Sequence, residues 1–166
     1  MNIAVFSDSH DNLPNVEKAL VLAKEAKLTH GFHLGDFCSP FTVKMLADSG
    51  ISWHCVWGNN DGDKVSCMRV GGEQVDFADG DYREITLEGR ILFLTHYPQI
   101  ARMAALSGKY SASFFGHNHR YSQEILEDTL LVNPGEILGH RFKEPSFGIY
   151  STENNTFERV LLPASV

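Results

Sequence analysis

Cysteine is scarce in this sequence, and long apolar runs are absent. Cys38, Cys55 and Cys67 are odd in number and form no C-x-x-C pair, which fits reduced thiols better than disulfides or a thiolate zinc site. No segment approaches the ~20 consecutive apolar residues of a membrane-spanning helix. The opening segment 1–6 lacks a basic leader, so it indicates a first strand and not a signal peptide. We expect a soluble, cytoplasmic protein that does not bind a membrane.

Clustered positive charge is also missing. The chain has 14 Lys and Arg against 21 Asp and Glu, which gives a formal net charge of -7. Strong binding to nucleic acids depends on clustered basic residues, so we do not expect it here. A length of 166 residues, with 43% hydrophobic and 21% charged residues, is typical of one globular domain. We therefore expect a single domain over residues 1–166, which could assemble into a homo-oligomer.

Apolar runs and helical spacing alternate along much of the chain. Short apolar runs predict strands at residues 3–6, 31–34, 52–57, 91–94, 113–115 and 130–132. Apolar residues at helical spacing predict helices at 13–23, 40–47 and 98–106. Segments 147–150 and 157–161 predict a hairpin with a polar turn, whereas 65–88 yields only short strands and loops. This alternation favours an α/β layer architecture.

Five of the predicted strands are followed directly by Asp, Asn or His. The segments are Ser7-Asp8-Ser9-His10, Gly35-Asp36, Gly58-Asn59-Asn60-Asp61, Thr95-His96 and Gly116-His117-Asn118-His119. In α/β sheets the carboxyl ends of the strands form the edge where ligands bind. Each motif alone is common, and its glycine also fits a plain turn. The five together, each directly after an apolar run, predict one shared metal site.

The side chains that could hold metal comprise two carboxylates, four imidazoles and one amide oxygen. They are Asp8, Asp36, His10, His96, His117, His119 and Asn59. One divalent ion could use only part of this set, whereas two ions ~3.5–4 Å apart with a bridging carboxylate would use it all. At an extended strand end His117 and His119 would point the same way, which a helix would not allow. We interpret His30, His54 and His140 as ordinary hydrogen-bonded residues.

Taken in order, these motifs resemble a known family. Asp8-x-His10, Gly35-Asp36, Gly58-Asn59, His96 and Gly116-His117-x-His119 resemble the calcineurin-like metallophosphoesterase superfamily. The short length, the segments 7–12 and 58–61, and Asn133-Pro134-Gly135 are similar to its branch of small YfcE-like phosphodiesterases. The resemblance covers nearly the whole chain. It implies a four-layer α/β/β/α metallophosphoesterase sandwich with two central mixed sheets.

The resemblance also implies a role for each ligand. One metal would be held by Asp8, His10, Asp36 and His119, and the other by Asp36, Asn59, His96 and His117, with Asp36 as the bridge. Asp36, Asn59 and His96 would in addition serve the catalytic step. The cofactors would be two divalent metal ions, with manganese expected and nickel, zinc, iron or cobalt also compatible with these ligands.

The activity that the resemblance implies is metal-dependent hydrolysis of a small phosphodiester. Metal-bound hydroxide would attack phosphorus, and the metals would stabilise the charge that develops on the phosphate oxygens. An alternative is a catalytically weak metal-binding scaffold, because the same fold also resembles the retromer subunit Vps29. The complete set of ligands favours the enzyme.

Among the departures from the superfamily pattern, two concern Asn60 and Glu136. Asn60 stands where many larger members carry a histidine that assists the leaving group, and an amide cannot act as that acid. The enzyme should therefore prefer good leaving groups, such as aryl phosphodiesters, unless Asp61, water or a partner supplies the proton. Glu136 stands where serine is usual, in a segment interpreted as a turn near the site or as a purely structural turn. Trp53 and Trp57 are interpreted as core residues.

Overall fold

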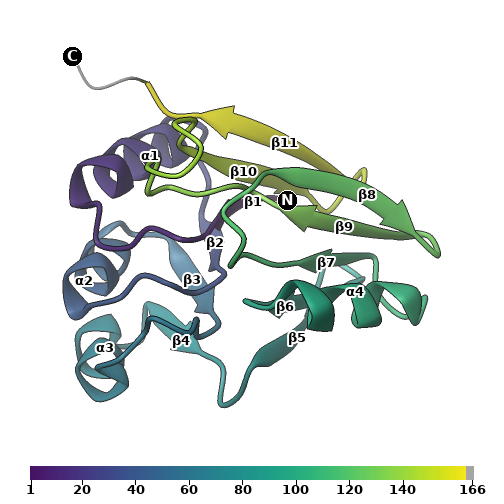
Figure 1. The fold of residues 1–166 in the computed structure, drawn as a ribbon, viewed down its shortest axis with the longest axis horizontal. Helices are drawn as coiled ribbons and strands as arrows, with labels where there is room; N and C mark the ends of the chain where they lie inside the picture. Colours follow the sequence, from purple (N-terminus) through teal and green to yellow (C-terminus); the bar gives the residue numbers. More distant parts are fainter. Residues whose placement is uncertain (164–166) are drawn as a thin grey trace.

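The computed structural model describes residues 1–163 and contains two β-sheets flanked by helices (Figure 1). The strands in this range are β1 (Asn2–Phe6), β2 (His30–His33), β3 (Ser52–Cys55), β4 (Val75–Phe77), β5 (Tyr82–Leu87), β6 (Arg90–Thr95), β7 (Ala112–Phe114), β8 (Ser122–Leu126), β9 (Thr129–Asn133), β10 (Ser146–Ser151) and β11 (Thr156–Leu161). The helices in the same range are α1 (Leu13–Glu25), α2 (Pro40–Asp48), α3 (Lys64–Gly71) and α4 (Pro98–Leu106).

Both sheets contain parallel and antiparallel strands. The six-stranded sheet has the order β11-β10-β1-β2-β3-β4, and the five-stranded sheet has the order β5-β6-β7-β9-β8. In the first, β1, β2, β3 and β4 run parallel and β10 pairs antiparallel with β1. In the second, β6, β7 and β9 run parallel, with β5 and β8 as antiparallel outer strands. The predicted pair of mixed sheets is confirmed.

The core residues divide the molecule into four layers. Alternate side chains of a strand point to opposite faces, so one strand can serve two cores. Ala4 and Phe6 of β1 belong to the core beneath α1, α2 and α3, whereas Ile3 and Val5 belong to the core between the two sheets. Ala101 of α4 belongs to a third cluster on the outer face of the five-stranded sheet. Figure 1 shows the resulting order of helices, sheet, sheet and helix.

The predicted helices at 13–23, 40–47 and 98–106 are confirmed as α1, α2 and α4. Each has a proline in its first turn, where a missing N–H leaves no hydrogen bond unmade. The side chains of Asn12 and Ser39 cap α1 and α2 by accepting from the backbone N–H of Asn15 and Phe41. Within residues 1–163, no helix is long and apolar enough to cross a membrane.

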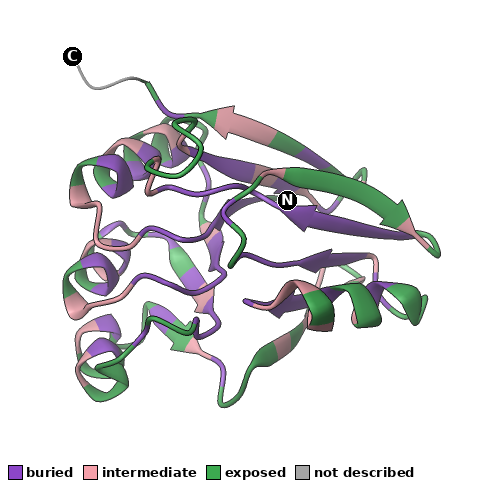
Figure 2. Cartoon of the chain, viewed as in Figure 1, coloured by how far each residue is buried: buried purple, intermediate pink, exposed green. Residues whose placement is uncertain are grey.

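The expectation of only short strands and loops for 65–88 is wrong in part. The segment includes most of α3, whose buried residues are Cys67 and Gly71, while the larger apolar side chains of Val65 and Met68 are exposed. The sequence prediction also missed β8, an outer strand with no buried residue. Figure 2 shows it exposed along its length beside the buried β9. Trp53 and Trp57 are buried in the core, as predicted.

The indole ring of Trp53 fills the space beside Gly31 on the neighbouring strand. The two residues are register partners on β3 and β2. The ring Nε1 donates to Ser49 Oγ at 3.1 Å, which fixes the ring orientation. A Cβ added at Gly31 would lie 2.4–2.8 Å from three ring atoms. The contact between these strands therefore depends on a residue without a side chain.

We expect Gly31→Ala to lower the free energy of unfolding by about 1–3 kcal/mol, because the added methyl group overpacks a ring that is held in place. Gly80→Ala is the matched control, since a Cβ there meets no atom within 4 Å. Urea unfolding followed by tryptophan fluorescence measures both variants. Equal unfolding midpoints for the two would show that the ring moves aside without cost.

Candidate metal centre

The carboxyl ends of five strands meet at one place in the structure. Asp8 and His10 follow β1, Asp36 follows β2, Asn59 follows β3, His96 follows β6, and His117 and His119 follow β7. Backbone hydrogen bonds join the loops, for example from Asp8 N to Gly35 O at 3.1 Å and from Gly116 N to His96 O at 3.1 Å. All seven side chains predicted as ligands lie in this cluster of loops.

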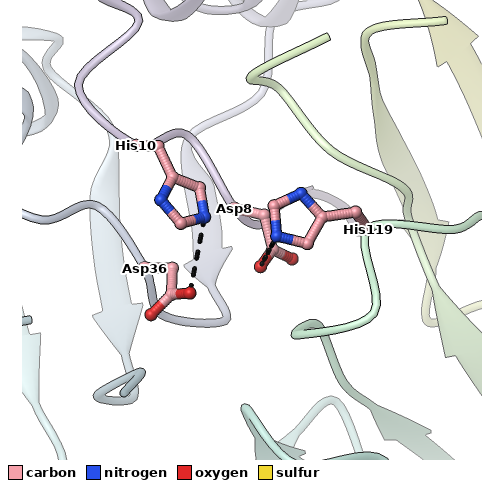
Figure 3. Close-up of side chains that lie close together, drawn as sticks. All are labelled: Asp8, His10, Asp36 and His119. Carbon is pink, nitrogen blue, oxygen red and sulfur yellow. Dashed lines mark ion pairs between the residues drawn. The ribbon is translucent and has the colours of Figure 1, made fainter. Parts of the chain in front are cut away.

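One group of side chains consists of Asp8, His10, Asp36 and His119 (Figure 3). A donor atom from each lies within 4.8 Å of the others. His10 Nε2 is 3.4 Å from Asp36 Oδ2, and His119 Nε2 is 3.5 Å from Asp8 Oδ1. The two imidazole rings stack with their centroids 5.0 Å apart. Four oxygen and nitrogen donors therefore face a common point.

A second group consists of Asp36, Asn59, His96 and His117. Asn59 Oδ1 lies 3.1 Å from His96 Nε2 and 2.9 Å from His117 Nδ1. His96 Nε2 is also 3.5 Å from Asp36 Oδ2, so this carboxylate adjoins both groups. Asp8, Asp36, His96 and His119 are buried, whereas Asn59 and His117 are exposed. The second group therefore reaches the surface of the molecule.

Five of the seven residues adopt left-handed backbone conformations. The φ angles are 49° at Asp8, 42° at His10, 57° at Asp36, 72° at His117 and 64° at His119. Asp and His tolerate this region better than most residues, yet each instance costs roughly 1–3 kcal/mol. Such strain persists where the surroundings determine the conformation, and it concentrates at functional sites.

A glycine allows two of these loops to approach each other closely. A Cβ added at Gly58 would lie 2.1 Å from Asp36 Oδ1 and 2.4 Å from Asp36 N. Any side chain at this position would therefore push the loop after β3 away from the loop after β2. The glycine before Asn59 is consequently more than a turn residue, because it brings Asn59 within reach of Asp36 and His96.

The charges of the buried groups suit a bound cation. Burial raises the pKa of Asp8 to about 6, because the charges of His96 and His119 and the hydrogen bond from Ser7 offset only part of the desolvation of its carboxylate. Burial would also lower the pKa of His96, but its contact with Asp36 and the charge of Asp8 outweigh this and raise it. The buried His10 Nε2 makes no hydrogen bond within the described part of the chain. Carboxylate, imidazole and amide donors of this kind fit a divalent metal ion.

Hydrogen bonds fix the orientation of several side chains in this cluster. His96 Nδ1 lies 2.7 Å from Leu34 O, and because a carbonyl only accepts, Nδ1 carries the proton and Nε2 faces the site. Ser7 Oγ donates to Asp8 Oδ2 at 2.6 Å, and the backbone N–H of His117 donates to the same carboxylate. These bonds hold the Asp8 carboxylate and the His96 ring in place.

Two residues next to the predicted ligands, Asn60 and Asp61, support Asp36 and its loop. Burial would raise the pKa of Asp36, but contacts with His96 and hydrogen bonds from Asn60 N and Nδ2 hold it well below its usual range. Asp61 is buried and accepts from the backbone N–H of Asp36, Cys38 and Gly58. Its two oxygens are therefore committed to the backbone, which disfavours the suggested role as proton donor to a leaving group.

His33 is a further residue that sequence reasoning overlooked. It is fully buried, its Nε2 lies 3.1 Å from Ser9 Oγ, and burial lowers its pKa to about 3, so the ring is neutral. It lies within an apolar strand, and no motif marks it. His54, by contrast, contacts Asp76 and Arg83 away from the site, in agreement with its interpretation as an ordinary hydrogen-bonded residue.

Comparison with known proteins identifies close relatives. Residues 1–155 match the Calcineurin-like phosphoesterase superfamily domain. The phosphodiesterase MJ0936 of Methanocaldococcus jannaschii is 30% identical over 168 residues, which cover 98% of this chain and 99% of that protein. The structure of an archaeal phosphodiesterase has a TM-score of 0.89 at 30% identity, with 98% of this chain and 100% of the other covered.

More distant structures share the fold. YfcE, a phosphoesterase from E. coli, has a TM-score of 0.70 at 20% identity, covering 98% of this chain and 100% of its own. Vacuolar protein sorting 29 of Cryptosporidium parvum has a TM-score of 0.66 at 16% identity, covering 96% and 95%. Together with the archaeal structure, these likenesses confirm the predicted four-layer sandwich.

We expect Asp61→Asn to lower the free energy of unfolding by about 1–3 kcal/mol, because the amide keeps one acceptor oxygen and turns N–H groups toward backbone donors. Chemical denaturation of the metal-free protein measures the change. The matched control is Asp79→Asn, at an exposed position, for which we expect a change within about 0.5 kcal/mol. If both variants matched the wild type, the three backbone contacts of Asp61 would contribute nothing measurable.

Proposed function

Because the chain belongs to the calcineurin-like phosphoesterase superfamily, we propose that it is a metal-dependent phosphodiesterase that uses a binuclear centre to hydrolyse a small phosphodiester. The resemblance predicted from the motifs is confirmed, and the domain is that of a phosphoesterase hydrolase. The binuclear centre is supported above all by the position of Asp36, whose carboxylate lies beside both groups of side chains. One bridging carboxylate between two sets of ligands is the arrangement that a metal pair requires.

The proposed ligands divide between two cations. We assign Asp8, His10, Asp36 and His119 to one, and Asp36, Asn59, His96 and His117 to the other. Their mutual distances support this division, since one donor atom from each residue of the first group lies within 4.8 Å of the others, and His96 and His117 of the second group both contact Asn59 Oδ1. We propose manganese as the usual metal, although oxygen and nitrogen donors without thiolate also suit nickel, zinc, iron and cobalt.

The residues around the two metal ions would have different roles in the reaction. Bound divalent cations would offset the charge of the phosphate and lower the pKa of a water at the site. Asp36 remains ionised because His96 and Asn60 stabilise its charged form, so it can hold positive charge at neutral pH. Asn59 and His117 are exposed, and we propose that the phosphodiester approaches from their side. Asn59, His96 and Asp36 would then orient the reacting phosphate.

Asn60 affects which substrates can be hydrolysed well. Its amide Nδ2 donates to Asp36 Oδ2 at 2.8 Å, so the side chain supports the bridge. An amide is too weak an acid, however, to protonate a departing alkoxide. We propose that the enzyme favours phosphodiesters with good leaving groups.

A scaffold with little turnover is the second candidate function. The likeness in fold to vacuolar protein sorting 29 favours it, although at 16% identity that likeness concerns the fold alone. The seven donors argue for the enzyme, since a scaffold needs no complete metal pair.

The cytoplasmic location and the absence of strong nucleic-acid binding stay predictions from cysteine usage and charge.

We expect metal-stripped protein to hydrolyse bis-p-nitrophenyl phosphate once Mn²⁺ is restored, and to hydrolyse p-nitrophenyl phosphate more slowly. Asp36→Asn should reduce diester turnover by more than ~100-fold, because even residues outside the ligand set cost 10–100-fold in metal sites. Release of p-nitrophenolate, together with metal content by mass spectrometry, checks both points. Exposed Asp79→Asn is the control for the chemical change. A protein that binds two metals but hydrolyses neither ester would support the scaffold.

We expect Asn60→His to improve hydrolysis of diesters with poor leaving groups, by up to the roughly 10²-fold that a positioned general acid contributes. The measurement is kcat/KM across aryl methyl phosphates whose phenols differ in pKa, with a flatter dependence in the variant. Asn60→Ala loses the same hydrogen bond to Asp36 without gaining an acid, so it separates the two effects. A dependence equally steep in both variants would exclude position 60 as a place for the acid.

A further inference from the structure

Glu136 forms a buried contact with one of the proposed metal ligands. Its Oε2 lies 2.6 Å from His119 Nδ1, and both side chains are shielded from solvent. Glu136 follows β9 in the chain, whereas His119 follows β7. The two residues are 17 positions apart, so the contact depends on the packing of two separate loops.

The second oxygen of Glu136 is also in use. Oε1 accepts from the backbone N–H of Arg141 at 2.8 Å and of Phe142 at 2.9 Å. The same segment donates from Ile137 N to Ser7 O and from Leu138 N to Asp8 O. Glu136 therefore connects His119 to a loop that is itself bound to the first ligand-bearing loop.

This contact determines which nitrogen of His119 is available. An ionised carboxylate only accepts hydrogen bonds, so Nδ1 must carry a proton. A neutral imidazole then has its lone pair on Nε2, and Nε2 is the atom that lies 3.5 Å from Asp8 Oδ1. Carboxylates that contact the far nitrogen of a metal-bound histidine fix its ring orientation and strengthen it as a ligand.

We propose that Glu136 is a positioning residue, which holds His119 in its metal-binding tautomer and anchors the 137–142 loop to the metal centre. This inference rests on the proposed function in so far as His119 is taken to bind metal. The sequence showed only that Glu136 replaces the more usual serine. A serine hydroxyl is shorter than a carboxylate and has one oxygen, so it could not contact His119 and two backbone donors together.

Glu136→Gln tests the tautomer, because the two side chains have the same shape. The amide has one acceptor oxygen, and the two backbone N–H groups of Arg141 and Phe142 should take it. The NH₂ group would then face His119 Nδ1 and donate to it, which moves the ring proton to Nε2. Long-range ¹H–¹⁵N spectra of the metal-free protein report this directly. We expect an Nδ1–H ring in the wild type and an Nε2–H ring in the variant.

Mn²⁺ binding to the same proteins supplies the second readout. In Glu136→Gln, calorimetric titration should show a dissociation constant for Mn²⁺ that is 10–100-fold larger at one of the two sites. The matched control is Glu124→Gln, an exposed residue that pairs with Arg102 on the surface, and it should bind Mn²⁺ as the wild type does. Glu136→Ser should weaken Mn²⁺ binding as well. It should also speed hydrogen exchange at the amides of Arg141 and Phe142, because both lose their hydrogen bond to Glu136.

The outcomes separate this inference from the proposed function. An Nε2–H ring in the wild-type protein would overturn the role of Glu136, whether or not the variants fold. Unchanged Mn²⁺ affinity in both Glu136 variants would overturn it too. If wild-type protein bound Mn²⁺ and lost affinity in Glu136→Gln, yet hydrolysed no phosphodiester, the positioning role would hold and the phosphodiesterase would not.

Discussion

Two buried carboxylates, Asp8 and Asp36, set the main constraint on the structure around the site. Taking a carboxylate out of water is costly unless it is paired or hydrogen-bonded. Asp36 receives hydrogen bonds from Asn60 and an interaction with His96, which keep its pKa low, whereas burial raises the pKa of Asp8 to about 6. Asp8 is therefore the less compensated of the two. A cation beside it would lower this electrostatic cost, so retention of metal and stability of the loops should be coupled.

The loops are held together largely by the groups that surround these carboxylates. Asp61 accepts from three backbone N–H groups in two loops, and Glu136 accepts from two more while contacting His119. Because each carboxylate bridges segments that are distant in the sequence, the left-handed conformations of the ligand residues are determined from several sides. The strands on either side of the loops are buried and paired, and they supply the stability that offsets the strain.

The sequence was sufficient to predict the parts of the fold that repeat a simple pattern. Strands β1, β2, β6 and β7 read as apolar runs because both of their faces are buried, and α1, α2 and α4 have prolines in their first turns. The gathering of candidate side chains could be expected within each sheet, since parallel strands of one sheet end at a common edge, but the meeting of the two edges depends on how the sheets pack. The fold family, by contrast, required the motifs in order, because alternation alone does not distinguish two sheets from one.

The remaining features depend on contacts that no local pattern encodes. The helix α3 buries Cys67 and Gly71 but exposes the larger Val65 and Met68, and β8 has no buried residue, so in neither do the large apolar residues mark a buried face. His33 could not be distinguished from its apolar neighbours. The partners of Glu136 depend on the tertiary path of two loops.

The distribution of burial suggests why the two donor groups differ. Asp8 and His119 are buried and braced by Ser7 and Glu136, so this side of the site can hold a cation in a fixed environment. Asn59 and His117 are exposed and contact each other. The second group contains only the shared carboxylate of Asp36 beside one amide and two imidazoles, so it carries less negative charge than the first, and a cation there would keep more of its attraction for an anionic phosphate. In the proposed enzyme, the more buried first group would retain its metal, and the second group, through the exposed Asn59 and His117, would face the substrate.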